Sequence, residues 1–374
     1  MLNAVLKTFA GRIVYLMGSR DFSKKIIDWY LLNPRDLPWR KTKDPYRIWL
    51  SEIILQQTRV AQGLPYYLQF VRNFPNVKAL ANAPLEKVLR TWQGLGYYSR
   101  ARNLHACAKE IAFNYNGNFP DTYSNLLTLP GIGSYTAAAL SSIAFDKPDA
   151  VVDGNVFRVL SRIFGIQEDI SSSIGKKTFY NKAQALLDPK QPGTFNQAIM
   201  EFGALHCTPK SPGCVDCIFA SGCYANKNQM QALLPVNNKK VKVRNRYFTY
   251  FILMKGNKMA LKKREGKDIW SGLYDFYLIE GLKRKKPESI LSEDHVLKTI
   301  RNKATIVSQS EAYKHILTHQ RIEATFVILS LSRDFLIKDL KGIKGLKFYS
   351  SKEILALPKP VLISRFLSKN GILE

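Results

Sequence analysis

The sequence predicts a mainly α-helical region over about the first 230 residues and an α+β domain after it. From residue 21 to about residue 230, apolar residues recur at spacings of three and four, as on the buried face of a helix, and Gly or Pro separates the segments. After residue 246 the pattern changes to runs rich in β-branched and aromatic residues, which are typical of strands. A polar, basic stretch with one Pro lies between the two patterns and indicates a linker across the surface.

These patterns divide the chain into four parts: an N-terminal extension (1–20), a helical domain (21–224), a linker (225–246) and a C-terminal domain (247–374). In the helical domain we expect helices over 22–31, 45–58, 64–73, 85–92, 99–115, 134–144, 154–163, 175–186 and 194–206. In the C-terminal domain we expect strands over 247–255, 259–264, 273–279 and 324–332 and helices over 287–300 and 351–369. Within the extension, Met17 offers an alternative start to the chain.

The charge balance favours a polyanionic partner. Lys and Arg number 56 against 29 Asp and Glu, which gives a formal net charge of +27. Because each neutralised phosphate releases a counterion, nucleic acid explains this excess better than general solubility, a ribosomal role or a membrane-surface role. The sequence contains no apolar run of the roughly 18 residues that a membrane span needs, and its first 20 residues have no apolar core of the signal-peptide type. We therefore expect an intracellular monomer, in the cytoplasm or at the nucleoid.

Four of the five cysteines fall close together, in the pattern Cys207-x6-Cys214-x2-Cys217-x5-Cys223. In an intracellular chain this clustering favours a metal site over disulfides. Zinc and a four-iron cluster both accept four thiolates, so the spacing leaves both open. We expect the site to be structural, and we expect the fifth cysteine, Cys107, to be an ordinary buried helix residue.

A glycine-rich turn and an aspartate lie between predicted helices. In the turn Leu129-Pro130-Gly131-Ile132-Gly133, the two glycines permit a tight bend whose amides point outward, before a helix that begins at Ser134. Such a turn binds a backbone phosphate, although it can also be a plain connector. Asp153 follows in the segment VVDGN (151–155), where it fits the N-cap of the next helix. Hydrogen bonds at such a cap lower the pKa of a carboxyl group and keep it anionic.

Glu52 is an acid on a largely apolar helix side. It lies in WLSEIILQQT (49–58), and Ile48, Leu55 and Gln56 share its side at helical spacing. Burial there would raise its pKa and keep it protonated, as a general acid requires. The alternative is a surface glutamate, or a capping partner near Ser51.

These motifs resemble those of two related families. LPGIG followed by VVDGN and the four-cysteine loop is similar to the helix-hairpin-helix glycosylase superfamily, and the cysteine spacing is similar to that of members with a [4Fe–4S] cluster. LPWR (37–40), WLSEIILQQT (49–58), GLGYYSRARNL (94–104) and FNQAIMEFGALHC (195–207) resemble the adenine DNA glycosylases of the MutY family. The resemblance is close over about 22–230 and looser beyond. It implies two helical subdomains with an iron–sulfur loop (207–223).

The resemblance also implies an activity and roles for the two acids. Members of this family remove adenine mispaired with 8-oxoguanine, so duplex DNA with adenine opposite 8-oxoguanine or guanine would be the substrate. Glu52 would protonate the adenine, and Asp153 would stabilise the cationic sugar or briefly bond to it. Tyr135 and Asn155 would hydrogen-bond near these carboxyl groups. The family resemblance also places Gly131 and Gly133 in the DNA-gripping turn.

Further residues are implied around the flipped base. Gln56, Gln57 and Tyr97 would fill or wedge the duplex where the base leaves. Trp39 and Arg40 would line the adenine pocket together with Glu201. Core packing is the competing interpretation for Trp39 and for the Tyr97–Tyr98 pair, and for Glu201 we favour a structural role.

One departure separates this chain from the endonuclease III-type glycosylases, which the turn, the aspartate and the cysteines also resemble. Those enzymes carry a catalytic Lys two residues after the second turn glycine, where this chain has Tyr135. Without that amine no Schiff base with the sugar can form, so we expect a monofunctional glycosylase. The alternatives are an endonuclease III-like glycosylase with lyase activity and a non-catalytic, metal-stabilised DNA-binding protein.

The C-terminal domain is similar to the Nudix-like domain of the same family, through LKKR (261–264) and IWSGLYDF (269–276). The acidic REx2EE core of a Nudix box is not found in the sequence, so we expect the domain to recognise DNA rather than to hydrolyse nucleotides. Leu317-Thr318-His319 stands where the family has a Phe-Ser-His loop that recognises 8-oxoguanine. Thr318 and His319 keep the hydroxyl and the imidazole, whereas the aromatic wedge is lost. The alternative is an ordinary strand-entry turn.

Overall fold

The computed structural model describes residues 18–239, 242–266, 268–283, 285–340 and 343–372. The described chain forms two compact units. The helical unit contains residues 18–81 and 106–239, and the sheet unit contains residues 82–105 and the described residues from 242 onward. Residues 1–17 of the predicted extension, Met17 among them, lie outside the described residues.

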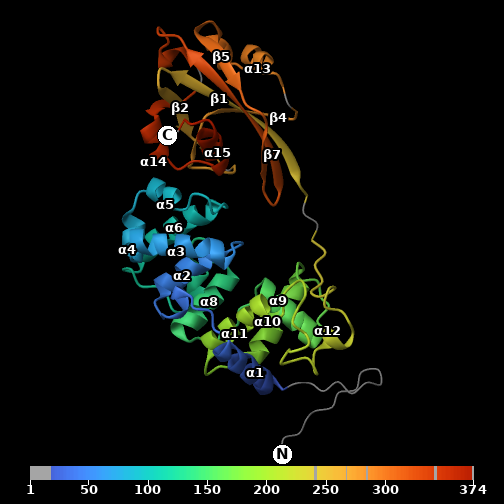
Figure 1. The fold of residues 1–374 in the computed structure, drawn as a ribbon. Helices are drawn as coiled ribbons and strands as arrows, with labels where there is room; N and C mark the ends of the chain where they lie inside the picture. Colours follow the sequence, from blue (N-terminus) through green and yellow to red (C-terminus); the bar gives the residue numbers. More distant parts are fainter. Residues whose placement is uncertain (1–17, 240–241, 267, 284, 341–342, 373–374) are drawn as a thin grey trace, which may run out of the picture. The chain divides into compact units, whose positions relative to one another are not determined.

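The helical unit is built from short helices joined by tight turns (Figure 1). Its elements are α1 (Ser19–Leu32), the 3-10 helix η1 (Pro38–Arg40), α2 (Pro45–Leu55), α3 (Val60–Asn73), α4 (Val77–Asn82), the second half of α6 (Ser99–Asn114), α7 (Tyr123–Leu126), α8 (Ser134–Phe145), α9 (Gly154–Phe164), α10 (Ser173–Leu186), α11 (Pro192–Leu205) and α12 (Tyr224–Lys227).

Helix α8 is the centre of this unit. Every residue from Thr136 to Ile143 is buried, and α8 packs against both α2 and α11. A helix that is apolar all round must be covered on all sides, and three consecutive alanines (137–139) let its neighbours approach closely. Because α11 also packs against α1 and α9, the elements that carry the predicted site residues are held around one buried helix.

The described strands of the sheet unit form an eight-stranded mixed sheet (Figure 1). The strand order is β3-β2-β1-β7-β5, and β4 pairs with β1, β6 with β7 and β8 with β2. The strands are β1 (Arg244–Lys255), β2 (Lys258–Lys263), β3 (Tyr274–Asp275), β4 (Tyr277–Gly281), β5 (Ala304–Gln309), β6 (Tyr313–Ile316), β7 (Gln320–Leu331) and β8 (Lys347–Ser350). The helices are α5 (Leu85–Thr91), the first half of α6, α13 (Pro287–Glu293), α14 (Ser351–Ala356), α15 (Val361–Lys369) and the 3-10 helices η2 (Leu297–Lys303) and η3 (Ile337–Asp339).

Both faces of the sheet are covered. The long strands β1 and β7 run parallel, with Phe251 opposite Val327. Val327 belongs to the core beneath α13 and η2. On the other face Phe326 stacks on Phe366 of α15 with ring centroids 4.1 Å apart, and on Tyr250 at 5.1 Å. Burial on both faces explains why β1 and β7 read as near-continuous apolar runs.

The predicted fold class is confirmed, with a helical N-terminal region and an α+β C-terminal region, but three predicted elements are interrupted. The expected helix 287–300 ends at Glu293, because the Asp294 carboxylate accepts the backbone N–H groups of Val296 and Leu297 and starts a 3-10 turn. The expected helix 351–369 breaks at Pro358 and Pro360, which have no N–H to donate. The expected strand 273–279 is split because β3 pairs with β2 and β4 with β1.

One predicted helix is shorter than expected, and three strands were not predicted. Helix α2 ends at Leu55 rather than at residue 58, because Gln57 adopts a left-handed backbone (φ +55°). The strands β5, β6 and β8 were not predicted, since they are only four to six residues long and mostly polar or half-exposed. Among the described residues, no helix has both the length and the apolar character that crossing a membrane would require.

Candidate active site

Glu52 and Tyr135 meet inside the helical unit. Glu52 lies on α2 and Tyr135 in the first turn of α8, and the tyrosine hydroxyl donates a hydrogen bond of 2.7 Å to Glu52 Oε2. The same hydroxyl lies 3.2 Å from Met200 Sδ on α11. Both Glu52 and Tyr135 keep partial exposure, so the carboxyl group is enclosed by protein but can still be reached.

Burial sets the acidity of Glu52. The pKa of its carboxyl group is raised to about 7, because desolvation and the negative charge of Asp153 raise it by more than the Tyr135 hydrogen bond and the Arg40 charge lower it. The direction agrees with the expectation from sequence. Because Asp153 acts on the pKa values of both Glu52 and Tyr135, the three side chains share one electrostatic environment. The structure therefore brings together acids that are a hundred residues apart along the chain.

Asp153 is the N-cap of α9. Its Oδ1 accepts the backbone N–H groups of Asn155 and Val156, at 2.9 and 2.8 Å, and its Oδ2 accepts the side-chain amide of Asn155 at 2.8 Å. These three donors supply the carboxylate with hydrogen bonds that a protonated acid would use less well. The N-terminal end of the helix adds a favourable partial charge.

The expected lowering of the pKa of Asp153 is wrong. Burial raises the pKa of this carboxyl group above its ordinary value, although three hydrogen bonds and the charge of Arg158 act in the opposite direction. The sequence shows the cap but not the depth at which it lies. The two acids nevertheless differ, because among the described residues Glu52 accepts one hydrogen bond, from Tyr135, whereas Asp153 accepts three.

The segment before Asp153 is fixed by a buried asparagine. The Asn196 side chain on α11 accepts the N–H of Val151 at 3.1 Å and donates to the carbonyl of Asp149 and to the Ser142 hydroxyl, both at 2.8 Å. Because Asn196 is fully buried, each of these bonds would be costly to lose. Asn196 is thus a positioning residue for the approach to the cap, and nothing in the sequence pointed to it beyond its place in a family motif.

Arg40 is held by an ion pair. Glu201, which is 1% exposed, accepts hydrogen bonds from Arg40 at 2.8 and 2.6 Å and from Arg35 at 2.6 Å. Burial would raise the pKa of Glu201, but these two arginines lower it overall. Glu201 therefore has the structural role that we favoured. Trp39 is also buried and packs edge-on against Tyr67, so its packing role is evident.

The predicted phosphate-binding turn has the expected backbone. Gly131 has a positive φ of 76°, and Leu129 and Ile132 are buried and anchor the turn between α7 and α8. Gly131 and Gly133 are exposed, and a side chain at Gly133 would meet only open space. Gly133 caps α8 and has no side chain to bond the first amides of the helix, which leaves these donors available to an external acceptor.

The four clustered cysteines share one loop region of the helical unit. Cys207 and Cys223 are buried, whereas Cys214 and Cys217 are partly exposed. The pKa of Cys217 is raised to about 11, chiefly by burial, and the charges of the other three sulfur atoms contribute to the rise, which places the four near one another. Cys107 is fully buried on α6, as expected.

Donors converge on these sulfur atoms. The Phe219 N–H lies 3.4 Å from Cys217 Sγ, Arg162 Nη1 lies 3.5 Å from Cys207 Sγ, and Gln231 Nε2 lies 3.9 Å from Cys214 Sγ. Such donors stabilise thiolates bound to a metal. Among the described residues no three His, Cys, Asp or Glu side chains are placed to hold a single metal ion.

Two buried arginines of α9 join the cysteine loop to the rest of the unit. Arg158 donates to the carbonyl of Cys207 at 2.7 Å and to the Asn155 side chain at 2.8 Å. Arg162 donates to the carbonyls of Thr208 and Gln231, at 2.7 and 2.6 Å. Neither arginine was predicted, since a charged residue on a helix usually lies in solvent.

Comparisons with known proteins agree with this architecture. Residues 50–186 match the family of HhH-GPD superfamily base excision DNA repair proteins, and residues 249–369 match the NUDIX domain. The adenine DNA glycosylase of Buchnera aphidicola (subspecies Acyrthosiphon pisum, strain APS) is 33% identical over 91% of this chain and 95% of its own length. This chain belongs to the adenine DNA glycosylase family.

Other relatives extend the same family relationship. The adenine DNA glycosylase of Rattus norvegicus is 44% identical over 57% of this chain and 43% of its own length. Among solved structures, a thermostable thymine-DNA glycosylase is 29% identical, with a TM-score of 0.52 over 56% of this chain and 97% of that one. A trapped endonuclease III–DNA covalent intermediate has a TM-score of 0.50 at 21% identity, covering 57% of this chain and all of that one, which shows the fold alone.

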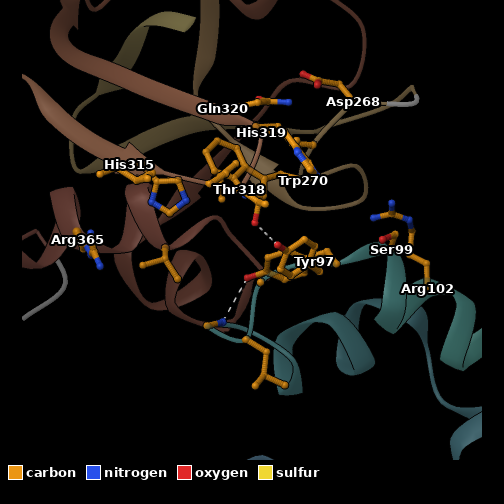
Figure 2. A pocket seen from close by; sticks show the side chains of 18 residues that line it. Tyr97, Ser99, Arg102, Asp268, Trp270, His315, Thr318, His319, Gln320 and Arg365 are labelled. Carbon is orange, nitrogen blue, oxygen red and sulfur yellow. Dashed lines mark hydrogen bonds between the residues drawn. The ribbon is translucent and has the colours of Figure 1, made fainter. Parts of the chain in front are cut away.

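The other residues that we expected to contact DNA lie in both units. In the helical unit Gln56 Nε2 lies 3.4 Å from the Thr136 hydroxyl, and Gln57 is exposed in its left-handed conformation. In the sheet unit Tyr97 also has a positive φ, of 47°, is 46% exposed, and shares a short hydrogen bond with Thr318 (Figure 2). His319 is exposed beside Thr318.

We predict that Glu201→Ala destabilises the helical unit by about 3 kcal/mol, because Arg35 and Arg40 lose a buried acceptor. The loss should be seen as a lower free energy of unfolding in urea, followed by helical circular dichroism. The control is Asp36→Ala, which removes an exposed pair with Lys41 and should change stability by less than about 1 kcal/mol. Equal effects of the two substitutions would show that the buried pair is not a structural requirement.

Proposed function

We propose that this protein flips an adenine out of duplex DNA and hydrolyses its bond to deoxyribose, with Glu52 as the general acid and Asp153 as the anion beside the sugar. The observation that carries the proposal is the convergence of the two carboxyl groups on Tyr135 with unequal hydrogen bonding. Membership of the adenine DNA glycosylase family supports adenine as the base that is released.

Glu52 supplies the proton that the leaving base needs. Cleavage of the bond between the sugar C1′ and adenine N9 leaves the electron pair on the base, and protonation of the ring makes the base a better leaving group. A pKa of about 7 leaves roughly half of the Glu52 groups protonated at neutral pH, whereas an ordinary glutamate would be almost fully ionised. Tyr135 orients the carboxyl group through its hydrogen bond to Oε2.

Asp153 acts on the sugar. As the base departs, positive charge develops on C1′ and the ring oxygen, and a fixed carboxylate stabilises that charge. The two backbone N–H groups and the Asn155 amide keep the oxygens of Asp153 in acceptor form and prevent the side chain from turning. Water then adds its oxygen to C1′ and gives up a proton, so the products are adenine and an abasic site.

The chemistry ends at the abasic site. A lyase needs an amine to form a Schiff base with the sugar, and the position after the phosphate-binding turn holds the phenol of Tyr135, already bonded to Glu52. We therefore propose a monofunctional glycosylase. The endonuclease III-like alternative is disfavoured by the same residue.

Recognition is shared between the units. The exposed glycines of the Gly131–Gly133 turn and the start of α8 suit a backbone phosphate, and Gln56 and Gln57 suit the gap that the flipped adenine leaves. In the sheet unit, Tyr97, Thr318 and His319 border one cavity, which supports their proposed role in reading 8-oxoguanine or guanine opposite the adenine.

The cysteines fit a [4Fe–4S] cluster, which would be held by Cys207, Cys214, Cys217 and Cys223. Such a cluster would take the four Cys thiolates as its ligands, and its binding does not require them to converge on one metal ion. Hence a set unsuited to a single ion does not count against a cluster. The bound cluster would stabilise the loop, and Arg162 would offset the negative charge of its thiolates.

We predict that Glu52→Gln slows single-turnover adenine release by about 10²–10⁴-fold while duplex binding persists, because the proton donor is lost. Release by the wild type should be faster opposite 8-oxoguanine or guanine than opposite thymine, and borohydride should trap no adduct. Glu168→Gln, an exposed glutamate of the same unit, is the control and should react like the wild type. Undiminished release by Glu52→Gln would assign the proton to another group, and a trapped adduct would refute monofunctional chemistry.

The rate of adenine release should fall as the pH rises through about 7. The folded pKa of Glu52 lies above the ordinary value of 4.5, so the acid form predominates below pH 7 and is lost above it. Above that pH the single-turnover rate constant for adenine release should fall tenfold per pH unit. The residual rate constant of Glu52→Gln should not show this decrease. A rate that increases through the same range would mean that Glu52 acts as a base.

Purified protein should contain about four irons per chain and absorb broadly in the visible. Cys217→Ser should lose iron and sulfide, whereas Cys107→Ala should retain both, because Cys107 lies buried on α6 outside the cluster loop. Colourless, zinc-loaded and fully active protein would rule out the iron–sulfur proposal.

A further inference from the structure

A cavity of about 570 Å³ lies within the sheet unit (Figure 2). The loop before α6 and the start of that helix form one wall, through Tyr97 and Arg102. The β6–β7 turn, through Thr318, and helix α15, through Arg365, form others. This volume is large enough for a nucleobase. Two residues predicted from sequence to contact DNA, Tyr97 and Thr318, therefore face the same space as two arginines for which the sequence indicated no role.

The cavity is rich in positive charge that the described protein does not neutralise. Arg102 donates one hydrogen bond of 2.8 Å, to the carbonyl of Ser271, and Arg365 is exposed. Within the described ranges neither arginine forms an ion pair. Asp268 is the acid on the cavity wall, but its carboxylate is bonded to Arg246 and Arg264. The two arginines therefore face the cavity with donors to spare.

Keeping Arg102 in this position has a cost. Burial lowers the pKa of its guanidinium, which shows that desolvation is not balanced by a nearby acid. An anion that binds from outside the protein would stabilise a partly buried cation that lacks an acidic partner. Near Arg365, His315 is also disfavoured as a cation, because burial and the charge of Arg365 lower its pKa.

The arginines stand on opposite sides of the cavity. Figure 2 shows Arg365 beside His315 at one side and Arg102 beside Ser99 at the other. Between them the hydroxyl groups of Tyr97 and Thr318 are joined by a hydrogen bond. A DNA strand carries a phosphate on each side of every base, so a strand that offers one base to the Tyr97–Thr318 pair would bring a phosphate toward each arginine.

We propose that Arg102 and Arg365 bind the backbone phosphates that flank the base opposite the adenine, and so hold that base against Tyr97 and Thr318. This inference rests on the proposed function, which assigns that base to the cavity. The guanidinium group is suited to the contact because it donates two parallel hydrogen bonds to one phosphate. Such contacts fix the register of the strand without reading its sequence. The arginines thus supply affinity, while discrimination is left to the residues between them.

The test measures binding in the Glu52→Gln background, which leaves the adenine in place. Arg102→Gln and Arg365→Gln should each weaken binding roughly eightfold at 0.1 M salt, and each should reduce the slope of log affinity against log salt by about 0.9, as one released counterion requires. The loss should be equal for duplexes with 8-oxoguanine and with guanine opposite the adenine. Arg333→Gln, an exposed arginine of the same unit outside the cavity, is the matched control and should do neither.

A methylphosphonate duplex identifies the phosphate. Neutralising either phosphate beside the base opposite the adenine should weaken duplex binding by the Glu52→Gln protein. Neutralising the phosphate that Arg365 contacts should not weaken binding by the Arg365→Gln variant any further. Arg365→Lys should restore the salt slope, which separates a charge contact from a folding defect. The proposal would be overturned if Arg102→Gln and Arg365→Gln had the same salt slope as Arg333→Gln. It would also be overturned if they lost affinity only for the 8-oxoguanine duplex. Failure of the proposed function would appear instead as wild-type protein that releases no adenine.

Discussion

The burial of two carboxyl groups around one tyrosine hydroxyl is the constraint on which the site depends. Taking Glu52 and Asp153 out of water raises the pKa of both, and the negative charge of Asp153 also disfavours ionisation of Glu52. The fold then separates them by hydrogen bonding, since Asp153 accepts three N–H groups and Glu52 accepts the Tyr135 hydroxyl. In the proposed mechanism, this difference assigns the proton to Glu52 and the negative charge to Asp153. The buried helix α8 and the cap of α9 are what hold them in place.

The polar groups behind the site are as buried as its core. Asn196 fixes the segment that leads to Asp153, and Arg158 connects the Asn155 side chain to the backbone of Cys207. Leaving a buried polar group without its hydrogen bonds is costly, so the bonded arrangement of these residues is favoured over alternatives. The cysteine loop is thereby joined through protein contacts to α9, the helix that Asp153 caps.

The sequence was informative where chemistry is local and poor where it depends on depth. The turn at Gly131, the cap at Asp153 and the acid at Glu52 were each visible as short patterns, and the structure brings the two acids together. The pKa of Asp153 was predicted in the wrong direction, because a cap motif does not reveal how much protein covers it. Arg158 and Arg162 were missed because their partners are carbonyl groups about 50 to 70 residues away. The packing of residues 82–105 with the sheet unit is equally invisible to local patterns.

The protonation states of the two acids can be measured directly by infrared difference spectroscopy of the free protein between pH 5 and pH 9. The account predicts a protonated-carboxyl band that disappears near pH 7, that is missing in Glu52→Gln, and that persists with a lower midpoint in Asp153→Asn, where the neighbouring charge has been removed. A band that survives in Glu52→Gln and vanishes in Asp153→Asn would place the proton on the wrong acid and contradict the account.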